Sequence, residues 1–207
     1  MIKSVIFDVD GVLVDSLDAN YKYFKDIFER AGYTMVAKDE YRSMFHISRD
    51  DMIKIIAKNS DAQEMARILA IEKEVPYAIE EMKLTEGSAE VVKALSGKYR
   101  LAIVTGRNGD GAERYLRHSG LEDYFETVVH YEHYENPKPH PEPIQIALTR
   151  LGVTPGEAVY IGDAETDFQA AAAAGTAFIL HADNKKIDGV GHQTFDFRDL
   201  PGMIERL

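Results

Sequence analysis

Two aspartates, Asp8 and Asp10, follow a short apolar run at residues 5–7. Such a run is typical of a buried parallel strand, and side chains two residues apart on an extended chain point to the same side. Two carboxylates held side by side repel each other and favour protonation unless a cation lies between them. A hard divalent cation with oxygen ligands, Mg²⁺ first, suits this pair. The alternative is a strand that ends in an Asp-rich turn, with Gly11 permitting the tight backbone.

Other residues that can do chemistry follow three further apolar runs. Thr105 ends one run, Asp163 ends another, and a third leads into a segment that reaches Lys138. In an open parallel sheet the ligand site lies outside the carboxyl ends of the strands, so these side chains are predicted to meet at one edge. Taken singly, each has an ordinary interpretation: a strand-to-helix cap, an exposed loop lysine, or a turn with a helix N-cap. Turn chemistry does not readily explain all of them at successive strand ends.

Phosphoryl transfer needs a nucleophile, neutralisation of the equatorial oxygens and a proton donor for the leaving group. Asp8 can attack phosphorus in line and form an aspartyl-phosphate, while Asp10 can protonate the leaving oxygen and then activate water. Mg²⁺ held by Asp8 and Asp163 would let a carboxylate approach an anionic phosphate. Thr105 can hydrogen-bond a phosphate oxygen, and Lys138 supplies a point positive charge.

The two residues after Thr105 extend this candidate phosphate site. Backbone amides near Gly106 offer a concave set of donors to an anion. Arg107 has two interpretations, because its guanidinium can either add a contact to phosphate or point into solvent. Gly106 and Arg107 are therefore candidate substrate-binding residues, together with Thr105 and Lys138.

The elements that must position these residues follow from the hydrophobic pattern. Short buried runs alternate with amphipathic segments that close at glycines, which indicates repeated strand-helix units. Such units build a parallel sheet with right-handed crossovers and helices on both faces, so we predict an α/β fold with a Rossmann-like, doubly wound parallel sheet. The predicted strands are 5–7, 101–104, 127–129, 158–161 and 177–180. The predicted helices are 88–96 (capped by Ser88 and stopped by Gly97), 110–118, 141–151 and 167–174.

The segment after the first strand has a different character. Apolar residues recur at helical spacing in three stretches, and no convincing strand is found there. These residues are Tyr21, Phe24, Ile27 and Phe28, then Met52, Ile53, Ile55 and Ile56, then Met65, Ile68 and Leu69. We therefore predict a core domain formed by 1–16 and 86–207, interrupted by a helical cap domain at 17–85.

Composition excludes several classes of function. The net charge of −11 and the pI near 5.1 argue against a nucleic-acid partner or a polybasic membrane surface. Because the chain has no cysteine, disulfides, thiolate catalysis and Cys-ligated zinc are excluded. No run of apolar residues is long enough for a membrane span, and the N-terminus lacks a signal-peptide pattern, so the cytoplasm is the expected compartment.

Together these motifs resemble those of the haloacid dehalogenase-like superfamily. The resemblance spans nearly the whole chain and rests on Asp8-Val9-Asp10-Gly11-Val12, a strand ending in Thr105, Lys138-Pro139-His140-Pro141-Glu142-Pro143, and Gly162-Asp163 with Asp167. An insertion between the first and second motifs resembles the helical-cap subclass, which includes phosphoglycolate phosphatases and β-phosphoglucomutases. The resemblance implies a nucleophile at Asp8, an acid/base at Asp10, phosphate stabilisers at Thr105 and Lys138, and Mg²⁺ ligation by Asp8, the Asp10 carbonyl and Asp163, with Asp167 close by.

The sequence departs from the superfamily pattern in two places. Gly106 stands where asparagine commonly follows the Ser/Thr of the second motif. In the insertion, Ser48 and Arg49 match a Gly-x-Ser-Arg pattern of the sugar-phosphate branch, but His46 replaces the glycine. Arg49 can bind a second anionic group of the substrate. Alternatively, Ser48 is a helix N-cap and Arg49 a solvated residue of the first turn.

These observations predict a Mg²⁺-dependent phosphatase that hydrolyses a small phosphorylated metabolite through an aspartyl-phosphate on Asp8. A β-phosphoglucomutase-like phosphomutase is the nearest alternative, for which Arg49 is the hint. A phospho-accepting signalling module of the receiver type is less favoured, because receiver domains lack a helical insertion after the first strand. A non-catalytic binding protein is also less favoured, because each expected catalytic residue type is present. We expect a monomer or a weak homodimer that binds neither nucleic acid nor membrane.

Overall fold

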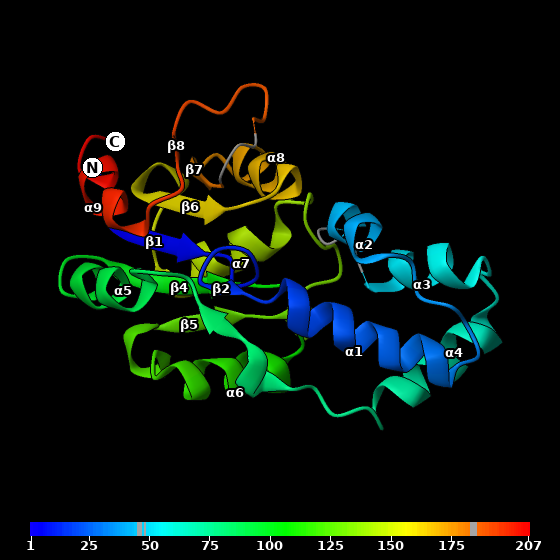
Figure 1. Ribbon diagram of the computed structural model, residues 1–207. Helices are drawn as coiled ribbons and strands as arrows, with labels where there is room; N and C mark the ends of the chain where they lie inside the picture. The colour runs from blue at the N-terminus through cyan, green and yellow to red at the C-terminus, as the bar shows by residue number, and fades with distance from the viewer. Residues whose placement is uncertain (45–46, 48, 183–185) are drawn as a thin grey trace. The chain divides into compact units, whose positions relative to one another are not determined.

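The computed structural model describes residues 1–44, 47, 49–182 and 186–207 (Figure 1). The chain divides into two compact units. The first unit comprises Met1–Asp15 and Lys83–Leu207, and the second comprises Ser16–Met82. None of the helices in the described residues combines the length and the apolarity needed to cross a membrane.

A parallel sheet forms the centre of the first unit, and within the described residues its strand order is β5-β4-β1-β6-β7-β8 (Figure 1). Its strands are β1 (Ser4–Phe7), β4 (Arg100–Val104), β5 (Thr127–Val129), β6 (Ala158–Gly162), β7 (Ala177–His181) and β8 (Gln193–Thr194). The first strand lies between β4 and β6, and pairs in parallel with both. Later strands are therefore added outward from β1 in both directions, which is the doubly wound arrangement. The predicted α/β class and its parallel sheet are confirmed, with β8 as an additional, two-residue edge strand.

Helices cover the two faces of this sheet. Those of the first unit are α5 (Ser88–Ser96), α6 (Gly109–Ser119), α7 (Glu142–Leu151), α8 (Glu165–Ala174) and α9 (Leu200–Ile204), with short 3₁₀ turns at Glu122–Tyr124, Tyr131–His133, Pro155–Glu157 and Phe197–Asp199. On one face, α7 and α8 pack over Ile6 and Tyr160. The next residue of β1, Phe7, points to the other face and stacks on Phe197 with ring centroids 6.2 Å apart. The predicted helices are found within two residues of their expected bounds.

The start of α5 differs from the prediction. Its N-cap is Gly87, with φ of 79°, and Ser88 is the first helical residue. The Ser88 hydroxyl is fully buried and donates to the Leu13 carbonyl oxygen at 3.5 Å. A buried hydroxyl needs a hydrogen-bond partner, and here a distant carbonyl supplies it instead of the helix's own amides. The prediction that Ser88 caps this helix is therefore wrong, whereas the helix does end at Gly97.

A short antiparallel pair, β2 (Val14–Asp15) and β3 (Lys83–Leu84), joins the two chain segments of the first unit. The prediction that no strand occurs in 17–85 is wrong, because β3 lies inside that range. The strand β3 has only two residues and both are exposed, so the sequence shows no hydrophobic pattern there. Thr85 extends the junction, since its amide donates to the Leu13 carbonyl at 3.0 Å and its hydroxyl to that of Val12 at 2.6 Å.

The second unit is helical in its described residues. It contains α1 (Leu17–Arg30), α2 (Lys38–Met44), α3 (Arg49–Ala57), α4 (Ala62–Glu72) and a 3₁₀ turn at Ile79–Glu81. Its own apolar core includes Ile27, Phe28, Ile53 and Ile68, all from stretches with predicted helical spacing. Ile55 was expected on the same apolar face but is 50% exposed, because it lies on the opposite side of α3 from Ile53 and Ile56. The short helix α2 was not predicted.

His181, at the carboxyl end of β7, is buried, and its Nδ1 has no hydrogen-bond partner among the described residues. Its ring lies edge-on to Phe197, with centroids 4.8 Å apart. Burial lowers the pKa of His181 below its ordinary value of 6.5, while Asp196 acts in the opposite direction. The folded protein therefore favours the neutral imidazole.

We expect His181 to contribute to the acid sensitivity of the fold. The stability that depends on its neutral form is fully present above pH 6.5 and is lost as the pH falls through the lower pKa of the folded state. His181→Leu should flatten the dependence of the free energy of unfolding on pH below that value, by at most about 1.4 kcal/mol per pH unit. Urea unfolding at several pH values measures this, with His118→Leu on the exposed side of α6 as control. An unchanged slope in His181→Leu contradicts the expectation.

Candidate active site

The register of three neighbouring strands brings their carboxyl ends to the same level. Phe7 of β1 lies opposite Ile103 of β4 and Ile161 of β6, so the residues that follow these strands emerge together. The Asp8 amide continues the ladder by donating to the Ile161 carbonyl at 2.9 Å. Asp8 and Asp163 therefore project from adjacent strand ends, as their places in the sequence predicted.

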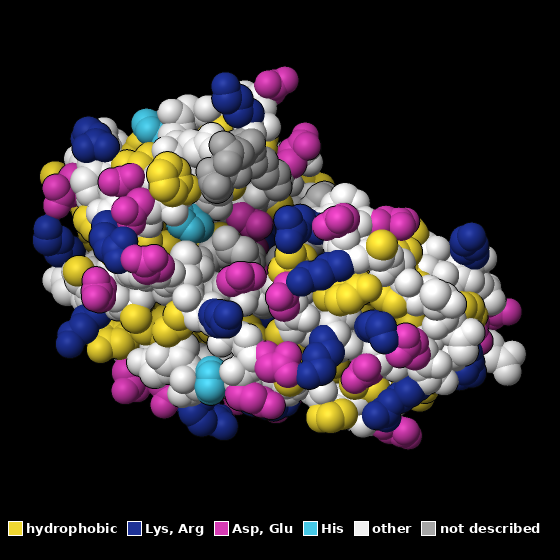
Figure 2. All heavy atoms as spheres, viewed as in Figure 1, with side chains coloured by type: hydrophobic (Ala, Val, Ile, Leu, Met, Phe, Trp, Pro, Cys, Tyr) yellow, Lys and Arg dark blue, Asp and Glu magenta, His cyan; other side chains and the backbone are white. Residues whose placement is uncertain are grey.

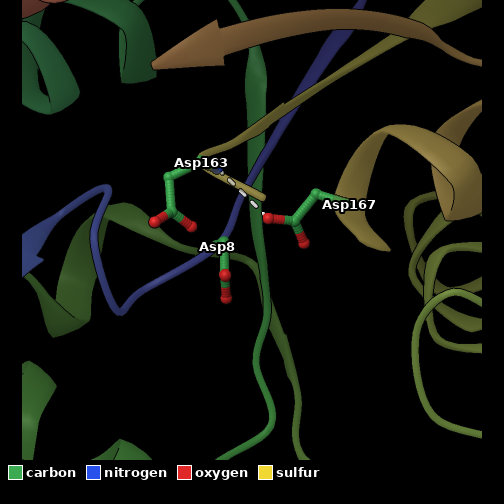
Figure 3. A group of neighbouring side chains, drawn as sticks. All are labelled: Asp8, Asp163 and Asp167. Atoms are coloured by element: carbon green, nitrogen blue, oxygen red, sulfur yellow. Dashed lines mark hydrogen bonds between the residues drawn. The ribbon is translucent and has the colours of Figure 1, made fainter. Parts of the chain in front are cut away.

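Three carboxylates meet at this edge: Asp8, Asp163 and Asp167 (Figure 3). Each offers one oxygen, and these oxygens lie within 4.8 Å of one another. Figure 3 shows Asp8 and Asp163 extending from the ends of β1 and β6, with Asp167 approaching from α8. Asp167 is almost fully buried, and its Oδ2 accepts hydrogen bonds from the amides of Asp163 and Ala164, both at 3.1 Å. Asp167 thus fixes the turn that carries Asp163.

Two glycines make room for these carboxylates. A Cβ at Gly162 would lie 2.5 Å from the Cβ of Asp167, closer than real side chains approach. A Cβ at Gly11 would overlap the carboxylate of Asp163, and Gly11 also has φ of 79°, which a side chain would strain. Both glycines are therefore required by the packing of the acids themselves.

Lys138 is the cation at the centre of this cluster. Its Nζ lies 3.1 Å from Asp8 Oδ2 and donates to Asp167 Oδ1 at 2.6 Å and to the Tyr160 hydroxyl at 3.0 Å. Burial alone would lower the pKa of Lys138, but the carboxylates of Asp167 and Asp8 more than offset it and hold that pKa well above its ordinary value. Lys138 is therefore a permanently charged group in the site.

The same surroundings favour the charged form of Lys138 but the neutral form of Asp8. Burial raises the pKa of Asp8 well above its ordinary range, Lys138 works against this, and the carboxylates of Asp167 and Asp163 add to it. A cation beside Asp8 would restore its charged form. The arrangement therefore favours cation binding at the carboxylate predicted to be the nucleophile.

The donor set fits a divalent metal ion. Three carboxylates, those of Asp8, Asp163 and Asp167, lie around the ammonium of Lys138, and a hard cation with oxygen ligands balances the remaining charge. Asp10 is not among the acids of this cluster, and its carboxylate pairs with Arg107. The oxygens of Asp167 already accept from Lys138, Tyr160 and two backbone amides. Asp8 and Asp163 are thus the better candidate ligands, and Asp167 a support for them.

Two tyrosines complete the site, and the sequence analysis missed both. Tyr160 is fully buried on β6, and its hydroxyl accepts from Lys138 and donates to Asp167 Oδ1 at 3.2 Å. The hydroxyl of Tyr134 donates to the carbonyl oxygen of Thr105 at 3.1 Å. A tyrosine inside an otherwise apolar strand was the available signal for Tyr160, because a buried hydroxyl needs a polar partner.

Arg107 contacts Asp10, which neither of its two interpretations anticipated. Its Nε donates to Asp10 Oδ2 at 2.8 Å and its Nη2 to Asp10 Oδ1 at 2.5 Å, in a two-point ion pair. The side chain of Arg107 is only 11% exposed, so it does not point into solvent. The Arg107 amide donates to the Thr105 hydroxyl oxygen at 3.2 Å, and Gly106 between them is exposed.

The candidate residues of the insertion are only partly described. Ser48 and His46 lie outside the described residues. Arg49 is the first residue of α3 and forms ion pairs with Asp50 at 3.2 Å and Glu72 at 3.3 Å, within the second unit. The role of Ser48 and Arg49 in substrate binding stays a prediction.

Comparisons with known proteins agree with this geometry. The family model described as haloacid dehalogenase-like hydrolase matches residues 5–181. A phosphoglycolate phosphatase from Rhodobacter capsulatus is 28% identical, over 99% of this chain and 98% of the relative. The pyrophosphatase PpaX from Bacillus pumilus is 30% identical, over 84% of this chain and 81% of the relative. The crystal structure of a haloacid dehalogenase superfamily hydrolase of subfamily IA from Geobacter sulfurreducens matches with a TM-score of 0.77 at 26% identity, over 98% of this chain and 96% of that chain.

We expect the Tyr160 hydroxyl to stabilise the buried lysine. Tyr160→Phe keeps the ring that stacks on Phe178 but leaves Lys138 and Asp167 each with one hydrogen bond fewer. Hydrogen bonds to buried charged groups are worth about 1.5–3 kcal/mol, so the free energy of unfolding should fall by about that amount. Urea unfolding measures the change, and Tyr131→Phe on the surface is the matched control. A loss no larger than the control's would show that the hydroxyl does not support Lys138.

Proposed function

The chain belongs to the haloacid dehalogenase-like hydrolase family, and from this premise we propose that it is a Mg²⁺-dependent phosphatase acting on a small phosphorylated metabolite. We further propose that the reaction passes through an aspartyl-phosphate on Asp8. The observation that carries the proposal is the position of Asp8, 3.1 Å from the Lys138 ammonium and within a cluster of acids at the carboxyl edge of the sheet. A nucleophilic carboxylate needs such a cation to approach a phosphate dianion.

In the proposed reaction Asp8 attacks phosphorus, and the bond to the leaving oxygen breaks. Lys138 holds Asp8 in place and neutralises charge on the transferred group, since it is charged and its side chain is only 13% exposed. Asp10, two residues after Asp8, supplies the proton to the leaving oxygen and later takes one from the hydrolytic water. The Thr105 hydroxyl and the amides near Gly106 hydrogen-bond the phosphate oxygens.

The proposed metal ligands are Asp8, Asp163 and the backbone carbonyl of Asp10, with Asp167 supporting Asp163 through the turn. When bound, Mg²⁺ would supply Lewis-acid neutralisation of the phosphate oxygens. The acid cluster supports a metal at this place. We propose Mg²⁺ because the cluster offers carboxylate oxygens, which are the ligands that hard cations prefer.

We propose that the helical insertion, 17–85, acts as a cap domain that contributes to the choice of substrate, with Ser48 and Arg49 as its candidate contacts. The relatives named above act on different phosphorylated compounds, and one fold supports many functions. The substrate is therefore assigned only as a small phosphorylated metabolite. We also propose the cytoplasm as its compartment, because a chain without cysteine has no disulfides to form in an oxidising environment.

We expect Asp8→Asn to abolish phosphate release while leaving the fold intact, because the amide is neutral and cannot form the phosphoenzyme. The loss should be at least about 10³-fold in kcat, as for removal of other nucleophiles. Phosphate release from a panel of sugar phosphates, phosphoglycolate, pyrophosphate and nucleotides measures it, with the exposed Asp123→Asn as control. Full activity in Asp8→Asn would exclude the mechanism. Transfer of phosphate to an added sugar phosphate, rather than to water, would instead identify a phosphomutase.

We expect Mg²⁺ to stabilise the folded protein as well as to support activity, because it neutralises carboxylates that repel one another. Binding to the folded state alone at 100 times the dissociation constant adds about 2.7 kcal/mol to the free energy of unfolding. A chelator should remove both this stabilisation and the activity, and added Mg²⁺ should restore them. Asp163→Asn should lose most of the Mg²⁺-dependent stabilisation. If its response equals that of the unmodified chain, Asp163 is not a ligand.

A further inference from the structure

The turn that follows β5 holds the loop that carries Arg107. This loop, 105–108, lies between the end of β4 and the start of α6, within the first unit. The Tyr131 amide donates to the Arg107 carbonyl oxygen at 2.9 Å. Glu132 Oε2 accepts the amide of Gly109, the first residue of α6, at 3.0 Å. Two hydrogen bonds from one 3₁₀ turn therefore fix the backbone at Arg107 and just after it.

Glu132 is held in turn by His130. Its Oε2 lies 2.6 Å from His130 Nδ1, and because an ionised carboxylate can only accept, that nitrogen donates. Burial works to raise the pKa of Glu132, but hydrogen bonds from its own backbone, from His130 and from the Gly109 amide hold that pKa below its ordinary value of 4.5. Glu132 is therefore a charged acceptor at neutral pH.

The ring of His130 is fixed as well. It lies against the start of α6, since a Cβ at Gly109 would come within 3.1 Å of two of its atoms. The His133 ring packs on it with centroids 3.6 Å apart, and His133 Nδ1 accepts the His130 amide at 3.2 Å. Burial, then His130 and Arg150, lower the pKa of His133 below 6.5, which keeps this nitrogen an acceptor at neutral pH. The contact to Gly109 is thus supported by neighbours on the same turn.

The Glu132 contact has two possible purposes. A carboxylate at the N-terminus of a helix stabilises that helix, so Glu132 can be a cap for α6 and nothing more. It can also hold the loop before α6 in the position that the site needs. The Glu132 side chain is 54% exposed, and exposed ion pairs add little to the free energy of unfolding. Substitution of Glu132 therefore leaves the fold intact, and its effect on the site can be measured.

The loop held in this way positions the proposed acid, Asp10. Arg107 donates from Nε and Nη2 to the two carboxylate oxygens of Asp10, at 2.8 and 2.5 Å. Because two parallel hydrogen bonds fix both distance and orientation, a shift of the Arg107 backbone displaces the Asp10 carboxylate with it. The connection from Glu132 to Asp10 therefore runs through the Gly109 amide, the adjoining backbone and the Arg107 side chain.

We propose that Glu132 is a positioning residue for Asp10, acting through the start of α6 and Arg107. Its effect on the reaction is indirect: it keeps Asp10 where the leaving oxygen can take a proton as the bond from phosphorus to that oxygen breaks. The inference rests on the proposed phosphatase function, with Asp10 as its acid. Loss of Glu132 should therefore matter most for substrates whose leaving oxygen needs that proton.

Two aryl phosphates of similar shape test the inference. Phenyl phosphate releases a strongly basic oxygen that needs the proton of Asp10, whereas p-nitrophenyl phosphate releases a weakly basic oxygen that can leave without it. The value of kcat/KM reports the steps up to the departure of the leaving group. We expect Glu132→Ala to lower kcat/KM for phenyl phosphate about 3- to 10-fold more than for p-nitrophenyl phosphate, the equivalent of about one hydrogen bond.

Variants near Glu132 separate positioning from helix capping. Glu132→Gln keeps an oxygen that can accept the Gly109 amide, so it should recover most of the lost selectivity. His130→Phe keeps a ring beside Gly109 but removes the donor to Glu132, and should give a smaller change of the same sign. Asp110→Asn is the matched control, because it removes a negative charge from the first turn of α6 and leaves the contact between Glu132 and Gly109 in place. It should not change the ratio of the two kcat/KM values.

Nuclear magnetic resonance measures the same connection without turnover. The exchange with solvent of the Gly109 amide reports its contact with Glu132, and that of the Arg107 Nε–H reports the pair with Asp10. We expect Glu132→Ala to speed the exchange of both protons by about 3- to 10-fold. Asp110→Asn should leave both rates unchanged. Thermal unfolding of each variant verifies that the fold is retained.

The outcomes separate this inference from the proposed function. An equal loss for both aryl phosphates in Glu132→Ala overturns the positioning role and leaves the phosphatase proposal standing. The same change of ratio in Asp110→Asn also overturns it, because helix capping then accounts for the effect. If the unmodified chain releases phosphate from no compound, the phosphatase proposal fails, and the exchange of the Arg107 Nε–H alone decides whether Glu132 positions the pair of Arg107 with Asp10.

Discussion

The buried ion-pair network that joins Lys138 to Asp8 and Asp167 is the interaction on which the rest of the site depends. Three acids at one sheet edge repel one another, and burial makes that repulsion stronger because water no longer screens it. Lys138 offsets the repulsion from the centre of the cluster. Removing one partner of a buried pair commonly costs about 3–5 kcal/mol, so these residues stabilise the fold and the chemistry together. Figure 2 shows acidic and basic side chains interspersed over the rest of the visible surface, where such pairs contribute far less.

The backbone supports this network as much as the side chains do. The parallel register sets Asp8 and Asp163 at one level, Asp167 ties the intervening turn through two amides, and Gly11 and Gly162 leave room for the carboxylates. A side chain at either glycine would displace an acid directly. The pairs Asp10-Gly11 and Gly162-Asp163 therefore form the turns and also leave room for the carboxylates of the site.

Much of the core was predictable because its elements bury continuous apolar runs. The strands and helices of the first unit follow from that pattern, and so does the gathering of Asp8, Thr105 and Asp163 at one edge. Where an element is defined by one remote partner, the pattern carries no signal. Ser88 hydrogen-bonds Leu13 rather than capping its own helix, and β3 exists because it pairs with β2.

The same limit applies to the site. Residue types indicated which groups can carry the chemistry, but not which of them contact each other. Arg107 lies 97 positions from Asp10 and Tyr160 lies 22 positions from Lys138, so only the folded chain brings these pairs together. Even the local spacing of Asp8 and Asp10 is not sufficient, because the acid cluster contains Asp8 but not Asp10, whose carboxylate pairs with Arg107.

The two cationic side chains of the site, Lys138 and Arg107, contact different acids. Lys138 is bound to two acids and a buried tyrosine, and any substitution there disturbs the nucleophile. Arg107 forms a two-point ion pair with Asp10, whose own side chain is 22% exposed. The two pairs still interact electrostatically, because the carboxylate of Asp10 helps to raise the pKa of Asp8, so a change at Arg107 also alters the surroundings of the proposed nucleophile.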